Sequence, residues 1–227
     1  MTKGAKLHQE AEDLRETDNL LEALKVSEES IVEHQKEGNY RGIADSLQTK
    51  VLTYKHLFLR SQDKAFAILA LKDAEASIEL AKLHNIQDIL GACFFRLGEV
   101  SMLFEEYNKA ADYYRQALDN FSGTDCERGD YRYHLGEALY KSGQEQEGLR
   151  SYYQGLTEIQ ENVSQVEPFL ASVWESGCHM HLAYLLKNKD PQKAEKHLDT
   201  ARRIIESDKK LIIRKRQLKE LEKVLNY

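Results

Sequence analysis

Proline and glycine are scarce in this chain of 227 residues, with 2 and 12 copies. Both residues interrupt helices, so their scarcity favours long helices over strands and turns. Sustained alternation of apolar and polar residues is also missing, which argues against a β-sheet. Alanine, leucine, glutamate, lysine and glutamine, which form helices readily, are frequent. We therefore expect an all-α fold.

Long apolar runs are missing as well. No stretch approaches the roughly 18 apolar residues that a membrane span requires, and residues 1–6 begin no apolar signal core. The 3 cysteines, Cys93, Cys126 and Cys178, are odd in number and far apart, as expected for reduced thiols. These absences predict a soluble, cytoplasmic protein.

Negative charge is in modest excess, at −6, which disfavours extensive binding of nucleic acid. Residues 208–227 carry 7 Lys/Arg against 3 Asp/Glu, whereas the remaining residues carry 25 against 35. The basic run 214–216 lacks interleaved aromatic residues that stack on bases, so we interpret it as a solvated helix face. A nuclear address or a phosphate patch is the alternative.

The apolar periodicity predicts helices along the whole chain. The expected helices span residues 4–17, 20–37, 40–60, 63–84, 87–104, 107–121, 128–142, 145–161, 167–187, 191–207 and 209–226. Gly38 and Gly143 are placed to end helices, and Asp190 with Pro191 is placed to begin one. Residues 61–63 offer capping side chains, and residues 122–125 are predicted to be a loop.

One pattern recurs along the chain and is clearest over residues 94–117. Its residues there are Phe94, Leu97, Gly98, Ser101, Tyr107, Ala110, Tyr114 and Ala117, and a weaker copy covers residues 135–155. Small residues at this spacing let two helices pack closely as an antiparallel pair, and such pairs stack into a solenoid. Five small anchors, Ala23, Ala74, Ala110, Gly148 and Ala194, predict five such pairs with some lengthened helices.

This pattern resembles the tetratricopeptide repeat (TPR) family, and the resemblance extends over most of the chain. It implies a single solenoid domain over 1–227, a right-handed superhelix whose first helices line a concave groove. The helix pairs would occupy residues 4–207, and 208–227 would form a capping helix. The chain departs from the family at Ser122, where a proline is usual, and in its irregular repeat spacing. Longer-helix repeats of this kind resemble those of regulators and adaptors.

The resemblance also implies which side chains line the groove. The candidates are Phe95, Glu99, Met102, Tyr133, Glu137, Tyr140, His179 and Ala183, all offset from the packing face. Aromatic and Met side chains are typical anchors, and the acidic edge favours a partner with Lys or Arg. Chaperone-tail binding is disfavoured, because Glu12, Glu99 and Glu137 stand where a basic clamp is required. The alternative is that some candidates merely pack against neighbouring repeats.

Residues that could carry catalysis are few. Cys178 and His181 share a helix face, but two ligands do not complete a zinc site. Cys93 is expected to be buried, and Cys126 is expected in a loop beside two acidic residues that oppose thiolate formation. The glycines inside the predicted helices form no phosphate-binding loop. We therefore predict no catalytic residue, metal or cofactor.

The predicted function is protein binding by a non-enzymatic scaffold or adaptor. Leucines at heptad-like positions in the last helix, Leu211, Leu218, Leu221 and Leu225, leave open an oligomerisation module or homodimer, although Arg214 interrupts the apolar positions. A third reading is the sensor part of a regulator whose output domain lies on another chain. Neither nucleic acid nor a membrane is an expected partner.

Overall fold

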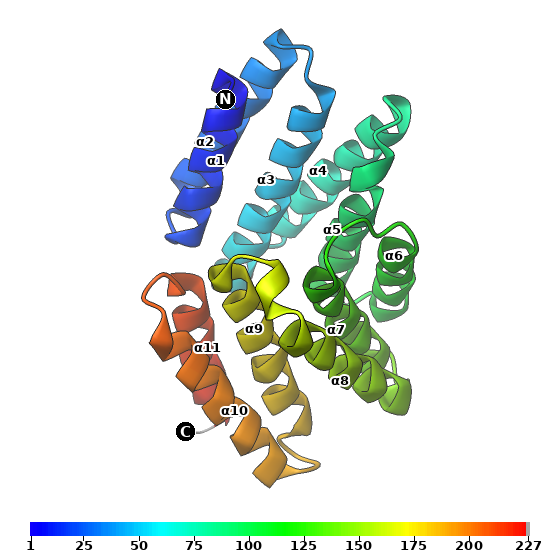
Figure 1. Cartoon of the computed structure of the whole chain (residues 1–227), viewed down its shortest axis with the longest axis vertical. Helices are drawn as coiled ribbons and strands as arrows, with labels where there is room; N and C mark the ends of the chain where they lie inside the picture. Colours follow the sequence, from blue (N-terminus) through cyan, green and yellow to red (C-terminus); the bar gives the residue numbers. More distant parts are fainter. Residues whose placement is uncertain (226–227) are drawn as a thin grey trace. The chain divides into compact units, whose positions relative to one another are not determined.

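The structure is a computed structural model and describes residues 1–225. These residues form α-helices and two short 3-10 helices, and they contain no β-strand, which confirms the predicted all-α fold. The elements, shown in Figure 1, are α1 (Lys3–Glu16), α2 (Leu20–Lys36), α3 (Tyr40–Ser61), α4 (Lys64–Leu83), η1 (Gln87–Ile89), α5 (Leu90–Leu103), α6 (Tyr107–Asp119), α7 (Asp125–Lys141), α8 (Glu145–Glu161), η2 (Val163–Gln165), α9 (Pro168–Leu186), α10 (Pro191–Ser207) and α11 (Ile212–Leu225).

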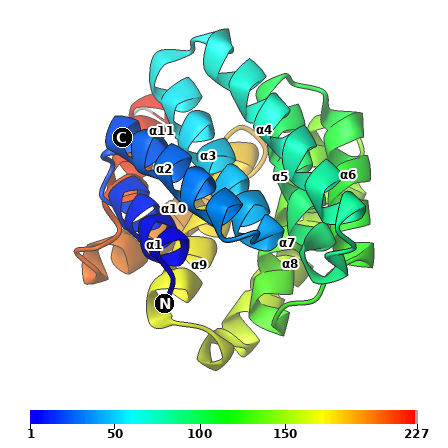
Figure 2. The ribbon, with the colours of Figure 1, turned by 90° about the horizontal axis from the view of Figure 1, so that it is seen from above.

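Consecutive helices pack as pairs: α1 with α2, α3 with α4, α5 with α6, α7 with α8 and α9 with α10. The chain divides into two compact units, unit 1 (Met1–Ser122) and unit 2 (Gly123–Tyr227). In unit 1, whose helices are also seen from above in Figure 2, α3 contacts α1 and α2, and α5 contacts α3 and α4. In unit 2, α9 contacts α7 and α8. Each pair therefore stacks on the next within its unit, as in a helical solenoid.

One turn geometry recurs between helices. A residue with positive φ follows the helix, and the next residue donates its N–H to a carbonyl five positions earlier, which satisfies the helix end. The five donor–acceptor pairs are Asn19–Leu14, Asn39–His34, Ile86–Ala81, Glu106–Ser101 and Gln144–Leu139. The φ angle is 64° at Gly38 and 94° at Gly143, the two predicted helix-ending glycines, and 59° at Glu105, which carries no such sequence signal.

Three predicted helix starts differ from the structure by three residues, and other boundaries differ by one or two. Helix α5 begins at Leu90 rather than at 87, because residues 87–89 form the 3-10 helix η1. Helix α7 begins at Asp125 rather than at residue 128, because the Thr124 hydroxyl accepts a hydrogen bond from the Glu127 N–H and caps the helix. Cys126 therefore lies buried in the first turn of α7, and its predicted place in a loop was wrong. Helix α11 begins at Ile212 rather than at 209. Its predicted end at residue 226 lies outside the described residues.

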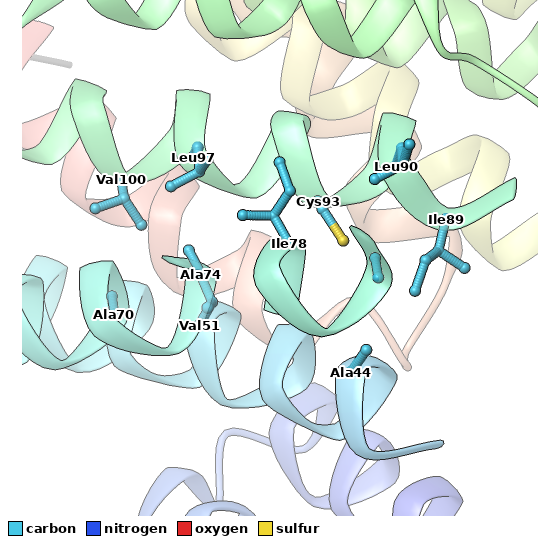
Figure 3. Packing of buried hydrophobic residues seen from close by; sticks show 11 residues of the cluster. Ala44, Val51, Ala70, Ala74, Ile78, Ile89, Leu90, Cys93, Leu97 and Val100 are labelled. Atoms are coloured by element: carbon cyan, nitrogen blue, oxygen red, sulfur yellow. The ribbon is translucent and has the colours of Figure 1, made fainter. Parts of the chain in front are cut away.

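The core of unit 1 lies between α3, α4 and α5. Figure 3 shows side chains of α5 pointing toward those of the other two helices, with Cys93 near Ile78. Buried alanines contribute to this core, among them Ala44 of α3 and Ala74 of α4. All five predicted small anchors are buried, which confirms their packing role.

Glycine allows α7 and α8 to approach even more closely. A Cβ atom on Gly148 would lie 2.6 Å from the backbone nitrogen of Tyr140, and one on Gly136 would lie 2.8 Å from the carbonyl oxygen of Gly148. Because these obstacles are backbone atoms, they cannot rotate away. The weaker repeat predicted over 135–155 thus corresponds to a genuine backbone-to-backbone contact.

Helix α11 covers the end of the last helix pair. Its Ile213 and Leu218 side chains and that of Leu211, just before the helix, are buried. Leu221 and Leu225 pack on a cluster that includes residues of α9 and α10. Arg214 donates from Nε to the Val173 carbonyl of α9 at 3.1 Å. This residue, which interrupts the leucine spacing in the sequence, therefore attaches the capping helix to α9.

Replacing Gly148 with Ala tests the approach of α7 and α8. We expect a loss of about 2–3 kcal/mol, even though Ala gains about 1 kcal/mol of helix propensity, because the methyl group meets the backbone. Gly177→Ala is the matched control, since its methyl group would meet side-chain atoms and no backbone, namely the Arg214 guanidinium at 2.8 Å and the Tyr133 hydroxyl at 3.0 Å. Urea unfolding followed by fluorescence of the single tryptophan, Trp174, measures both. Equal stabilities of the two variants would contradict the prediction.

Candidate binding face

The first helices of neighbouring pairs touch one another, α3 with α5 in unit 1 and α7 with α9 in unit 2. We call the side of each unit formed by these first helices its first-helix face. All eight candidate groove residues lie on α5, α7 and α9. Their surroundings within each unit decide which of them a partner could reach.

In unit 1, Glu99 is buried and forms ion pairs with Lys55 of α3 and with Arg96 one turn earlier on α5. A buried carboxylate requires such compensation, because removal from water strongly disfavours its charge. Phe95 is also buried, with its ring centroid 5.3 Å from that of Tyr114 on α6. Met102 remains partly exposed.

In unit 2, Glu137 joins α7 to α9. Its Oε2 lies 2.7 Å from His181 Nδ1, and its Oε1 lies 2.7 Å from Lys141 Nζ. Burial alone would raise the pKa of Glu137, but His181, Lys141 and His134 outweigh burial and hold that pKa well below its ordinary value. Glu137 is thus a charged carboxylate whose two oxygens contact His181 and Lys141 of the same unit.

The two tyrosines of α7 have different environments. Tyr133 is 1% exposed, stacks on His134 and lies 6.1 Å from the ring of Tyr152 on α8. Burial raises the pKa of its phenol well above the ordinary value. Tyr140 is partly exposed, and Lys189 Nζ lies 5.1 Å from its ring centroid. Tyr140 is therefore accessible to a partner, whereas Tyr133 packs in the interior between α7 and α8.

His179 and Ala183 of α9 point toward the last helices rather than toward α7. His179 Nδ1 lies 2.8 Å from His197 Nδ1 of α10, and Ala183 belongs to a buried cluster with residues of α10 and α11. The side chain of α9 that meets α7 is His181. Helix α9 is rotated about its own axis so that Cys178 and Leu182 pack in the cluster formed with α7 and α8. His179 and Ala183 therefore lie on a different side of the helix.

The sequence analysis missed the cationic partners of the two acidic candidates. Lys141, four residues after Glu137, and Arg96, three residues before Glu99, stand at spacings that bring helix side chains together, so this signal was readable. Lys55 lies 44 residues from Glu99 on another helix, and no local pattern indicates that contact. The acidic edge predicted from the sequence is consequently ion-paired within each unit.

The cysteines and possible metal ligands are the remaining reactive groups that the sequence offered. All three cysteines are buried and outside disulfides, and burial raises the pKa of each thiol, which disfavours the reactive thiolate. Across residues 1–225, no three His, Cys, Asp or Glu side chains are grouped as metal ligands would be. None of the helices in that range combines the length and the apolar composition that crossing a bilayer demands.

Comparison with known proteins provides a likeness in fold. No family model matches the chain, and no curated protein matches it. Among solved structures, the crystal structure of BtubC (BKLC) from P. vanneervenii is similar, with a TM-score of 0.52 and 19% sequence identity. The match covers 90% of this chain and 89% of that chain. At this identity the likeness supports the fold alone, and membership of the TPR family stays a prediction.

Replacing Glu137 with Gln tests the central ion pair of unit 2. At pH 7 we expect a loss of about 1–3 kcal/mol, because the buried carboxylate of Glu137 loses its charged contacts with the partly exposed Lys141 and His181. The folded-state pKa of Glu137 lies below the unfolded value of about 4.3. The wild-type advantage is therefore full above the unfolded value and is lost as the pH falls from there through the lower folded-state value.

Glu145→Gln is the matched control, since Glu145 pairs with Lys189 at the surface. We expect this variant to differ from wild type by less than about 0.5 kcal/mol. Urea unfolding at pH 7 and pH 3, followed by Trp174 fluorescence, measures both variants. A Glu137→Gln protein as stable as the control at pH 7 would show that the ion pair contributes little.

Proposed function

We propose that the protein is a non-enzymatic scaffold or adaptor that binds a peptide or protein segment on its first-helix faces. One observation carries the proposal: aromatic and Met side chains remain accessible there, while the neighbouring charges are paired internally. These side chains are Met102 on α5, Tyr140 on α7 and Tyr184, 42% exposed, on α9. Such residues are favourable anchors, because they bury a large area with little loss of conformational freedom.

The placement of Tyr184 supports its inclusion. Tyr184 follows His181 by three residues, a spacing that places both on one side of α9, and His181 contacts Glu137 of α7. Tyr140 likewise follows Glu137 by three residues. The two tyrosines thus flank a contact between neighbouring first helices, which is where a bound segment would cross from one helix to the next.

The proposed partner is recognised more by these anchors than by charge. Glu99 and Glu137 were expected to attract Lys or Arg side chains, but their ion pairs within the chain weaken that attraction. The buried candidates Phe95, Tyr133, His179 and Ala183 are proposed to hold the helices in place. We extend the proposal to a cytoplasmic location, which the three free thiols support.

The double variant Tyr140→Ala/Tyr184→Ala tests this function. Both side chains are accessible, so their removal should leave the fold intact and weaken capture of a partner at least about tenfold, as loss of anchor residues does. Leu69→Ala is the matched control, because Leu69 is 44% exposed and lies on α4, the second helix of its pair. Pull-down from native lysate with mass spectrometry measures capture by all three proteins.

A partner that is lost with the double variant and kept with Leu69→Ala would establish binding at this face. Equal recovery with all three baits would contradict the proposal. Circular dichroism of each bait confirms that helix content is unchanged. A sensor that acts through another chain would use the same face and would give the same result.

Self-association through α11 is the second candidate function. The heptad-like leucine spacing suggested this function. However, Leu211 and Leu218 are buried, and Leu221 and Leu225 pack inside unit 2. The apolar side chains of α11 that remain exposed are Ile212 and Val224. A dimer would therefore have to form on a small apolar surface among basic residues, so we rank this function below partner binding.

Light scattering distinguishes the two candidates. We expect the full-length protein to be a monomer, and Leu218→Ala to lower stability by about 2–4 kcal/mol without changing the molar mass. Val224→Ala is the control, because Val224 is 53% exposed. A wild-type dimer that dissociates when Val224 is replaced would favour self-association instead.

A further inference from the structure

His179 of α9 and His197 of α10 form an imidazole pair at the packing interface of these helices. Their Nδ1 atoms lie 2.8 Å apart, and their ring centroids lie 5.1 Å apart. A hydrogen bond between two Nδ1 atoms requires that one carries a proton and the other does not. Two protonated rings would bring two donors together, so this contact exists only while at least one ring is neutral.

The surroundings offer the protonated rings little compensation. Both Nε2 atoms are buried without a hydrogen-bond partner among the described residues. The carboxylate of Glu175 lies 3.9 Å from His179 Nε2 and already accepts a hydrogen bond of 2.8 Å from Gln160. A proton added to either ring would therefore create a buried charge that Glu175, at 3.9 Å from His179 and already hydrogen-bonded, compensates only weakly.

The other groups around the pair are cationic or uncharged. Arg203 and Lys193, both on α10, repel a proton on His179 and on His197, respectively. Tyr153 of α8 has its ring centroid 6.1 Å from that of His197 and is itself covered by Lys193. Burial, Arg203 and Lys193 therefore all disfavour protonation of the pair.

Helices α7 and α11 also pack on α9, but their charged groups are directed elsewhere. Glu137 of α7 contacts His181, on a different side of α9 from His179. Arg214 of α11 binds the Val173 carbonyl, and Glu222 of α11 pairs with Arg202. These contacts leave Glu175 as the nearest carboxylate to the pair.

We propose that the His179–His197 pair is an acid-operated latch, which holds α10 against α9 at neutral pH and releases α10 together with α11 on acidification. Release would uncover the apolar cluster that these helices share, which includes Met180, Leu198 and Ile205. The protein would then present in acid an apolar surface that is closed at neutral pH. This device is independent of partner binding on the first-helix faces.

The direction of the pH effect follows from proton linkage. Burial, and to a lesser extent Arg203, lowers the pKa of His179 to about 4. Burial, followed by His179 and Lys193, lowers the pKa of His197 to about 4 as well. In an opened or unfolded chain both rings take protons near the ordinary value of about 6.5. The closed state is therefore fully favoured above about pH 6.5 and becomes less stable as the pH falls toward 4.

A pH titration of the full-length chain tests the latch. The opening equilibrium constant should rise at least about a hundredfold between pH 7 and pH 4, since proton uptake by even one ring, with a pKa of about 4 when closed and about 6.5 when open, supplies that factor. Trp174, on α9, reports the change by fluorescence. Hydrogen exchange, corrected for its intrinsic pH dependence, should show α10 and α11 losing protection while α7 and α8 keep theirs.

The double variant His179→Gln/His197→Gln retains a polar pair that cannot titrate. We expect it to lose this acid transition, whereas the matched control His84→Gln should keep it, because His84 lies in unit 1 and stacks on Tyr40. The same transition in the double variant would assign it to carboxylates such as Glu137 and overturn the latch. A wild-type protein unchanged down to pH 4 would overturn it as well.

A second measurement covers the case in which the double variant does not fold. Histidine side-chain NMR of the wild-type protein follows each imidazole through the titration. We expect two of the rings to stay neutral until the α9–α10 contact opens. Assigned resonances of His179 and His197 that titrate near pH 6.5 in the folded protein would overturn the latch.

Discussion

The close approach of helix backbones at alanine and glycine positions is the constraint on which the rest of the structure depends. At Gly136 and Gly148 of α7 and α8 even one methyl group would meet the neighbouring backbone. Close pairs draw the first helices of successive pairs into contact, and only then can Glu99 meet Lys55 and Glu137 meet His181. The small residues thus determine which charges can neutralise one another.

Neutralisation of these buried charges changes how the first-helix faces can work. A face with unpaired carboxylates would recruit partners by long-range attraction, which depends strongly on salt. Here the carboxylates hold neighbouring first helices together, and the accessible Tyr and Met side chains are left for contact. Specificity would then come from shape and burial at short range, with charge serving the protein's own architecture.

The sequence predicted the helix pairs, the small anchors and the capping role of the last helix, because each depends on local periodicity. It also suggested candidate groove residues, but their accessibility depends on contacts between helices that no local pattern encodes. The rotation of α9 is the clearest example. In α5 and α7, Gly98 and Gly136 indicate in the sequence which side of the helix packs against its partner. In α9, Cys178 and Leu182 pack in the cluster with α7 and α8, so His179 and Ala183 point toward α10 and α11.

The recurring turn between helices has a consequence for how the chain folds. Each of the five turns is closed by a hydrogen bond between residues only five positions apart. A turn of this kind forms without any help from distant residues, so the helices that it joins can meet before the next pair exists. Contacts of short sequence separation allow rapid folding, and a chain emerging from the ribosome could complete its helix pairs one after another.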